Sequence, residues 1–135
     1  MSKQYNSLDN RPGVAINYAK IIGAVVLVVG ILGLLFGNPR ILGFNSDIVE
    51  DIVHLSTGAI MAYVGFAQRD NRLARTVVGA LGVVYLVVGI LGFVDPSLFG
   101  LIPNLYNLAD NLLHLGLGVL GIIIGYFLPA ATAVD

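Results

Sequence analysis

The chain has 135 residues, of which 57% are hydrophobic and 11% are charged, and its mean hydropathy is +0.89. Soluble domains carry about 25% charged residues, so this composition argues against a water-soluble globule and indicates an integral membrane protein. The net charge of −1 offers no basic excess to neutralise phosphates, which disfavours nucleic-acid binding. The absence of cysteine excludes disulfides, thiolate metal sites and cysteine nucleophiles.

Four apolar stretches are long enough to cross a bilayer, which takes about 20 residues because hydrocarbon cannot hydrogen-bond to the backbone. They predict transmembrane helices over residues 14–36, 48–67, 73–94 and 108–128. The whole chain, residues 1–135, is therefore interpreted as a single transmembrane domain. We expect an all-α integral membrane four-helix bundle in contact with the lipid bilayer.

The basic residues are distributed unevenly between the two ends of these spans. Six of the seven Lys and Arg residues lie in the N-terminal segment, the starts of the first and third spans or the second connection. Arg40 alone lies in the first and third connections. The positive-inside rule therefore predicts that both termini lie in the cytoplasm.

The sequence contains an internal repeat. The string Leu27–Gly33 recurs unchanged as Leu86–Gly92, and Glu50–Leu55 parallels Asp110–Leu115. The repeated unit is a two-helix hairpin, which returns the chain to its starting side, so both copies have the same topology. Such repeats are related by an axis along the membrane normal, and we expect a pseudo-two-fold axis in that direction.

Part of the second copy resembles a known family. The segment Leu98–Pro103 and the motif Asn-Leu-x-Asp-Asn-x-Leu-His-Leu-x-x-Gly over Asn107–Gly118 are similar to small bacterial four-span membrane proteins. That family is catalogued only as a domain of unknown function, and the similarity covers Tyr18 to Phe127. The resemblance implies a multi-pass protein of the bacterial cytoplasmic (inner) membrane, and it implies no activity.

Glycines form stripes along the spans, and small residues let membrane helices approach closely. One stripe repeats every seven residues in the first span and another follows helical spacing in the fourth: Gly23, Gly30 and Gly37, then Gly118, Gly121 and Gly125. Packing within the bundle is the favoured interpretation. The alternative is packing against another chain, which would make the protein a homo-oligomer or part of a larger membrane complex.

Two histidines lie inside the second and fourth spans, where ionisable side chains are costly and indicate a functional site by default. His54 and His114 each precede a glycine by four residues, so both imidazoles are predicted to face helix contacts. Each also follows a carboxyl group by four residues, Glu50 or Asp110, which places acid and imidazole on one helical face.

Three interpretations of the histidines compete. In the favoured one, each imidazole donates to its own upstream acid or to a backbone carbonyl, and no cofactor is bound. In the second, His54 and His114 meet across the pseudo-two-fold axis as axial ligands of haem b. In the third, acids and histidines form a divalent metal or proton site at the outer mouth, where Asp51-x-x-His54 has suitable spacing but Asn111 replaces the acid in the second copy. We name His54 and His114 as candidate cofactor-binding residues and assign no metal ligands.

Aromatic residues near the span ends are typical of an interfacial belt, and Tyr106 is assigned to the outer one. Tyr85 lies deep in the third span, where its hydroxyl needs a partner.

The sequence contains no hydrolase motif and no catalytic constellation, so we assign no catalytic residues and favour a non-enzymatic role. The leading hypothesis is a small structural or interaction protein that self-associates or serves as an accessory subunit. A bis-histidine haem protein that transfers electrons is the first alternative, and an oligomeric ion or solute conduit is the second.

Overall fold

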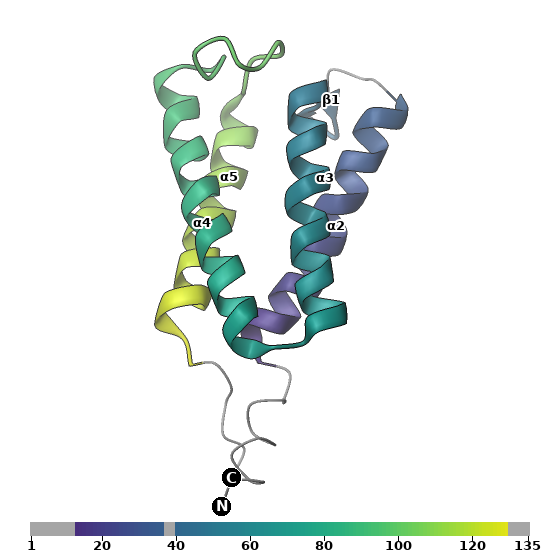
Figure 1. The fold of residues 1–135 in the computed structure, drawn as a ribbon. Coiled ribbons are helices and arrows are strands. Elements are labelled where there is room, and N and C mark those ends of the chain that lie inside the picture. The colour runs from purple at the N-terminus through teal and green to yellow at the C-terminus, as the bar shows by residue number, and fades with distance from the viewer. Residues whose placement is uncertain (1–12, 37–39, 130–135) are drawn as a thin grey trace, which may run out of the picture.

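The computed structural model describes residues 13–36 and 40–129, and the chain in these ranges is mostly helical (Figure 1). The helical elements are α2 (Val14–Phe36), α3 (Ile48–Ala62) with the π-helical turn η1 (Tyr63–Gln68), α4 (Asn71–Val94), and α5 (Leu108–Ile122) with the π-helical turn η2 (Ile123–Phe127). A short antiparallel pair, β1 (Arg40–Ile41) and β2 (Phe44–Asn45), connects α2 to α3. The all-α prediction is confirmed, and the four helices begin and end within two residues of the predicted bounds.

Each of the four helical stretches is long and apolar enough to cross a membrane, with lengths of 20 to 24 residues. Large apolar side chains are exposed along all four, which suits a lipid environment and indicates a multi-pass membrane protein. We call the end of the bundle where α3 and α5 begin the distal end, and the opposite end the proximal end. The β1–β2 pair and the 95–107 connection both lie at the distal end (Figure 1).

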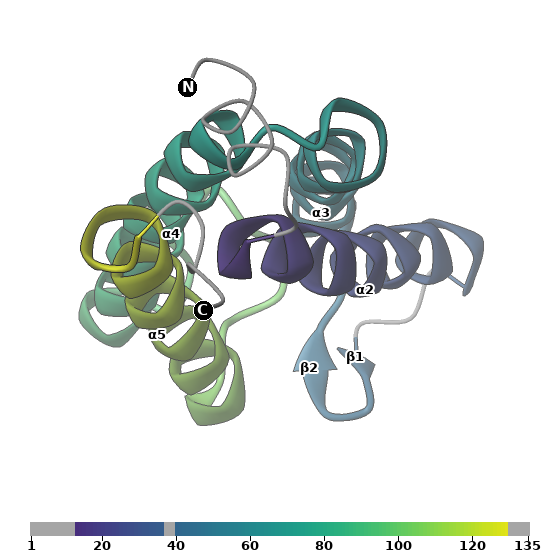
Figure 2. The ribbon, with the colours of Figure 1, turned by 90° about the horizontal axis from the view of Figure 1, so that it is seen from below.

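The helices form two hairpins, α2–α3 and α4–α5, and α2 contacts α4 of the second hairpin (Figure 2). Glycines bring the two backbones of each hairpin together. A Cβ added at Gly58 would lie 2.5 Å from the backbone nitrogen of Leu27, and one added at Gly118 would lie 2.5 Å from that of Leu86. Any larger residue would therefore force the paired helices apart.

The close contacts of the first hairpin recur at the corresponding residues of the second. A Cβ at Gly30 would meet the backbone nitrogen of Leu55 at 2.8 Å, and one at Gly89 would meet that of Leu115 at the same distance. The burial pattern along α3 and η1 also matches the pattern along α5 and η2 almost residue for residue. The two hairpins are thus built on one packing scheme.

The glycine stripes are used inside the hairpins. Among the helical glycines that the structure describes, only Gly116 has open space around an added Cβ, and every other one faces the partner helix of its own hairpin. Gly37, the last member of the predicted first stripe, lies outside the described residues. The favoured interpretation of internal packing agrees with these contacts, while association with another chain stays a prediction.

The two hairpins meet at the proximal end in an apolar core. Its most deeply buried side chains come from the starts of α2 and α4 and from the end of α3: Ile16, Ala19, Met61, Ala74 and Val78. At the same end, the backbone N–H of Gly13 donates to Asn71 Oδ1 at 2.9 Å. Apolar packing therefore fixes the proximal end, and the distal end is held together differently.

Candidate metal centre at the distal end

Buried polar side chains gather at the distal end of the bundle. They come from the segments around the first turns of α3 and α5: Asn45, Ser46, Asp47, Glu50, Asp51, Asp110, Asn111 and His114. Burying polar and charged groups is costly unless they are paired or bind an ion. A concentration of such groups at one end of an apolar bundle therefore marks the candidate functional site.

Side-chain caps fix where the two histidine-bearing helices begin. Asp47 is the N-cap of α3 and accepts from the backbone N–H of Glu50 at 3.0 Å. Asn107 caps α5 in the same way, accepting from the N–H of Asp110 at 2.9 Å, and Asp110 Oδ2 accepts from the N–H of Asn107 at 2.8 Å. This reciprocal capping box satisfies backbone donors that a helix start leaves unpaired.

Hydrogen bonds also join the two hairpins across the distal end. Asn45 N donates to Asp110 Oδ1 at 2.6 Å, Asn104 Nδ2 donates to Ser46 O at 3.1 Å, and Asn107 Nδ2 donates to Gly43 O at 2.8 Å. These contacts hold the start of α5 against the β2–α3 segment. They therefore set the separation of the two histidines that lie beneath them.

Glu50, His54 and His114 form one cluster below this polar layer. Each contributes one potential metal-ligand atom, and the three atoms lie within 4.8 Å of one another. Glu50 and His54 are one turn apart on α3, with 3.9 Å between Glu50 Oε2 and His54 Nε2. His114 comes from α5 of the other hairpin. The structure thus brings His54 and His114 together and adds a carboxylate to the pair.

Neither histidine makes the hydrogen bond to its own upstream acid that the favoured interpretation predicts. The 3.9 Å between Glu50 and His54 is too long for a hydrogen bond. Asp110 is occupied by the backbone N–H groups of Asn45 and Asn107. Nδ1 of both histidines is buried and has no hydrogen-bond partner among the described residues. An unpaired buried polar atom costs about 1–3 kcal/mol, so each histidine keeps one unsatisfied nitrogen inside the bundle.

Two tyrosines contact His114. The Tyr85 ring stacks on the imidazole with centroids 5.9 Å apart, and its hydroxyl shares a 2.8 Å hydrogen bond with Thr57 Oγ1. The Tyr106 ring meets the imidazole edge-on at 5.1 Å, and its hydroxyl donates to Glu50 Oε1. Burial and the neighbouring Glu50 raise the pKa of the Tyr106 hydroxyl, which keeps it a donor.

The placement of Tyr106 corrects its assignment to the aromatic belt. Its side chain is only 6% exposed and points into the bundle. The sequence carried no signal for this, because the direction of a side chain at the end of a connection depends on the path of the loop. Tyr85, in contrast, finds within the bundle the hydroxyl partner that its deep position requires.

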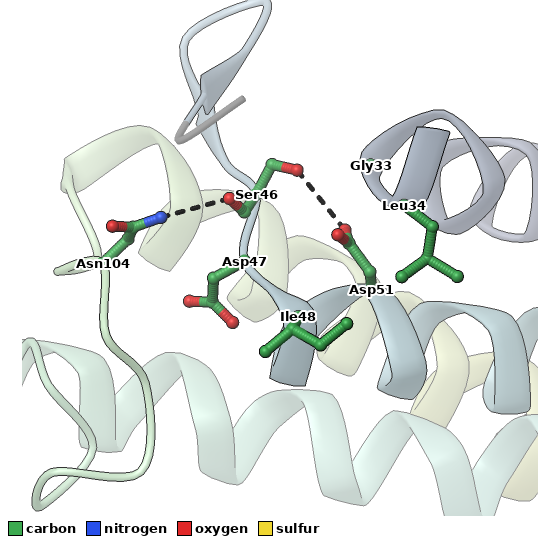
Figure 3. A pocket seen from close by; sticks show the side chains of 7 residues that line it. All are labelled: Gly33, Leu34, Ser46, Asp47, Ile48, Asp51 and Asn104. Atoms are coloured by element: carbon green, nitrogen blue, oxygen red, sulfur yellow. Dashed lines mark hydrogen bonds between the residues drawn. The ribbon is translucent and has the colours of Figure 1, made fainter. Parts of the chain in front are cut away.

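Asp51, which the sequence spacing paired with His54, lies outside the cluster. Its carboxylate accepts from Ser46 Oγ at 3.4 Å and packs against Gly33, where a Cβ would collide with it (Figure 3). Ser46, Asp47, Asp51 and Asn104 are among the residues that line a cavity of about 250 Å³ beside the start of α3. Glu50 therefore supplies the carboxylate of the cluster, and Asp51 faces this neighbouring cavity.

Comparison with known proteins identifies a family whose function is unknown. The model of the family described as "Domain of unknown function (DUF4383)" matches residues 16–127. No curated protein and no solved structure matches the chain. The resemblance seen in the sequence is therefore confirmed, and the role of the chain has to be argued from the cluster itself.

Proposed function

The chain belongs to this family of unknown function, and we propose that it binds a divalent transition-metal ion between its two hairpins through Glu50, His54 and His114. The observation that carries this proposal is the convergence of the three ligand atoms within 4.8 Å. Two imidazole nitrogens and one carboxylate oxygen are a donor set that suits zinc, and three protein ligands leave a fourth position open.

The distances suit a zinc ion after a small adjustment. Zinc bonds to nitrogen and oxygen are about 2.1 Å long, which places donor atoms of a tetrahedral site about 3.4 Å apart. The Glu50–His54 pair at 3.9 Å is close to that spacing, and the remaining closure is within reach of side-chain rotation. A bound ion would also balance the charge of the buried Glu50 carboxylate.

An ion in this position would cross-link α3 of one hairpin to α5 of the other. This agrees with the predicted structural role and requires no catalytic residues. Self-association, or service as an accessory subunit, remains compatible with the proposal. Either would have to use surfaces other than the glycine stripes, which are occupied within the hairpins.

Binding of haem b by His54 and His114 is the second candidate, favoured by the proximity of the two imidazoles. A haem surrounds its iron with a flat macrocycle between the axial ligands. Here Glu50, Tyr85 and Tyr106 contact the histidines from several sides, and they would have to move to admit that ring. A Soret band in protein from haem-replete cells would favour haem, whereas colourless protein that binds zinc would remove this candidate.

The proposal also includes the topology inferred from the sequence. The two hairpins are treated as copies related by a pseudo-two-fold axis along the membrane normal, and their matched glycine contacts support this. The basic residues favour a proximal end on the cytoplasmic side of a bacterial inner membrane. The metal centre would then lie near the outer face, and cysteine-accessibility labelling at each end tests this placement.

The direct test is zinc binding by the full chain purified in mild detergent and stripped with a chelator. We expect one zinc ion per chain by elemental mass spectrometry, and strong loss of affinity in His54→Gln and in His114→Gln. The control is Asp51→Asn, which changes a buried carboxylate adjacent to Glu50 but outside the cluster. Wild-type protein that binds no more zinc than a His54→Gln/His114→Gln double variant would overturn the proposal.

A further inference from the structure

The connection between α4 and α5 is a built structure that ends at Tyr106. Asp95 Oδ1 accepts from the backbone N–H and the hydroxyl of Ser97, at 2.9 and 2.7 Å, which starts the turn. At the other end, Tyr106 N donates to Pro96 O at 2.9 Å and closes the loop on itself. The side chain of Tyr106 is thereby directed from the second hairpin into the cluster.

Tyr106 contacts two of the three proposed ligands. Its hydroxyl donates to Glu50 Oε1, and the edge of its ring packs against His114. The hydrogen bond occupies one carboxylate oxygen and leaves Oε2, the atom 3.9 Å from His54 Nε2, on the side of the imidazoles. A free carboxylate would rotate about its terminal torsion, and this bond restricts that rotation.

We infer that Tyr106 is the positioning residue of the metal centre: its hydroxyl holds Glu50 Oε1 so that Oε2 faces the two histidines and binds the ion. The inference rests on the proposed function and names a residue that acts on the ion through Glu50. Ligating carboxylates and imidazoles in metal sites are oriented by outer hydrogen-bond partners, whose loss lowers metal affinity by about 10- to 100-fold.

Tyr85 provides a matched control within the same site. It also packs its ring against His114, but its hydroxyl is bonded to Thr57 and not to Glu50. Tyr85→Phe and Tyr106→Phe each remove one buried hydroxyl and keep the aromatic ring beside the same imidazole. Only the second change frees the Glu50 carboxylate.

The experiment compares zinc affinities by competition with a chromophoric chelator in detergent-solubilised full-length protein. We expect Tyr106→Phe to weaken zinc binding by about 10- to 100-fold, and Tyr85→Phe to stay close to wild type. Helical content by circular dichroism verifies that both variants are folded. Equal affinities for Tyr106→Phe and wild type, or equal losses in the two tyrosine variants, would overturn the inference.

A double-mutant cycle with Glu50→Gln separates positioning from a general structural role. If Tyr106 acts through the carboxylate, Tyr106→Phe has little further effect on the weaker zinc binding of the Glu50→Gln variant. A loss of the same size in both backgrounds would show that Tyr106 only supports the fold and would contradict the inference. Absence of zinc binding in wild-type protein is a different result, because it rejects the proposed function and the inference with it.

Discussion

The two hairpins share their packing but differ at the residues that form the site. Gly58 and Gly118 make the same backbone contacts, and His54 and His114 occupy matching turns of α3 and α5. The acid one turn earlier differs. Glu50 reaches the cluster, whereas the shorter Asp110 accepts from the backbone N–H groups of Asn107 and Asn45. One additional methylene group thus separates a candidate ligand from a capping residue.

A second matched pair shows the same divergence. Val26 in α2 and Tyr85 in α4 are both buried, at 7% and 6% exposure. Valine fills apolar space, while the tyrosine hydroxyl bonds to Thr57 and its ring stacks on His114. The same helix pairing therefore supports two chemically different interiors. As a result, the proposed site contains two imidazoles but only one carboxylate, and not one carboxylate from each hairpin.

The largest expected difference between the two hairpins is tested by changing the two acids, Glu50 and Asp110, separately. Glu50→Gln should reduce zinc affinity by more than the about 10- to 100-fold expected for an outer-shell partner, because it replaces a ligand. Asp110→Asn should retain more of the zinc affinity and instead lower thermal stability, because the α5 capping box is weakened by about 1 kcal/mol. Zinc titration and thermal unfolding of both variants measure the contrast. Similar effects of the two changes would mean that Glu50 and Asp110 have equivalent roles.

The shared packing can be tested at the glycines. Gly58→Ala and Gly118→Ala should each destabilise the protein by about 1–3 kcal/mol, because the new Cβ would press on the backbone of the partner helix. Reversible unfolding in mixed micelles measures the change, with Gly116→Ala as a control that has free space and should not destabilise, because alanine favours the helix more than glycine does. Unequal effects at Gly58 and Gly118 would contradict a common packing scheme.

The smallest expected effect concerns the 95–107 connection of the second hairpin. Hydrogen bonds from the Ser97 hydroxyl and backbone N–H lower the pKa of Asp95 below the ordinary value of an aspartate. A lowered carboxyl pKa contributes stability above the unfolded-state value, and that contribution is lost as the pH falls through the folded-state value. Melting temperatures of wild type and Asp95→Asn should therefore differ slightly at pH 7 and converge below about pH 4. A difference that persists at low pH would assign the effect to something other than this ionisation.

Much of the fold follows directly from local properties of the sequence. The length and hydropathy of the four apolar stretches predict the helices, because a membrane span must satisfy its own backbone. The spacing of glycines relative to His54 and His114 places both imidazoles toward helix contacts. These features depend on composition and helical periodicity, which the sequence contains. The proximity of the two histidines follows only if the hairpins also pack in the expected orientation.

The chemistry of the site was decided by the tertiary structure. Glu50 and Asp51 are neighbours at the start of α3, and either is within helical reach of His54. Only the rotation of α3 within the bundle turns Glu50 toward His114 and leaves Asp51 beside Gly33. The role of Tyr106 depends likewise on the path of a loop that brings it from one hairpin to the other. Sequence periodicity shows which residues share a face of one helix. Which of those residues enter the cluster depends on how the separate helices are rotated and connected.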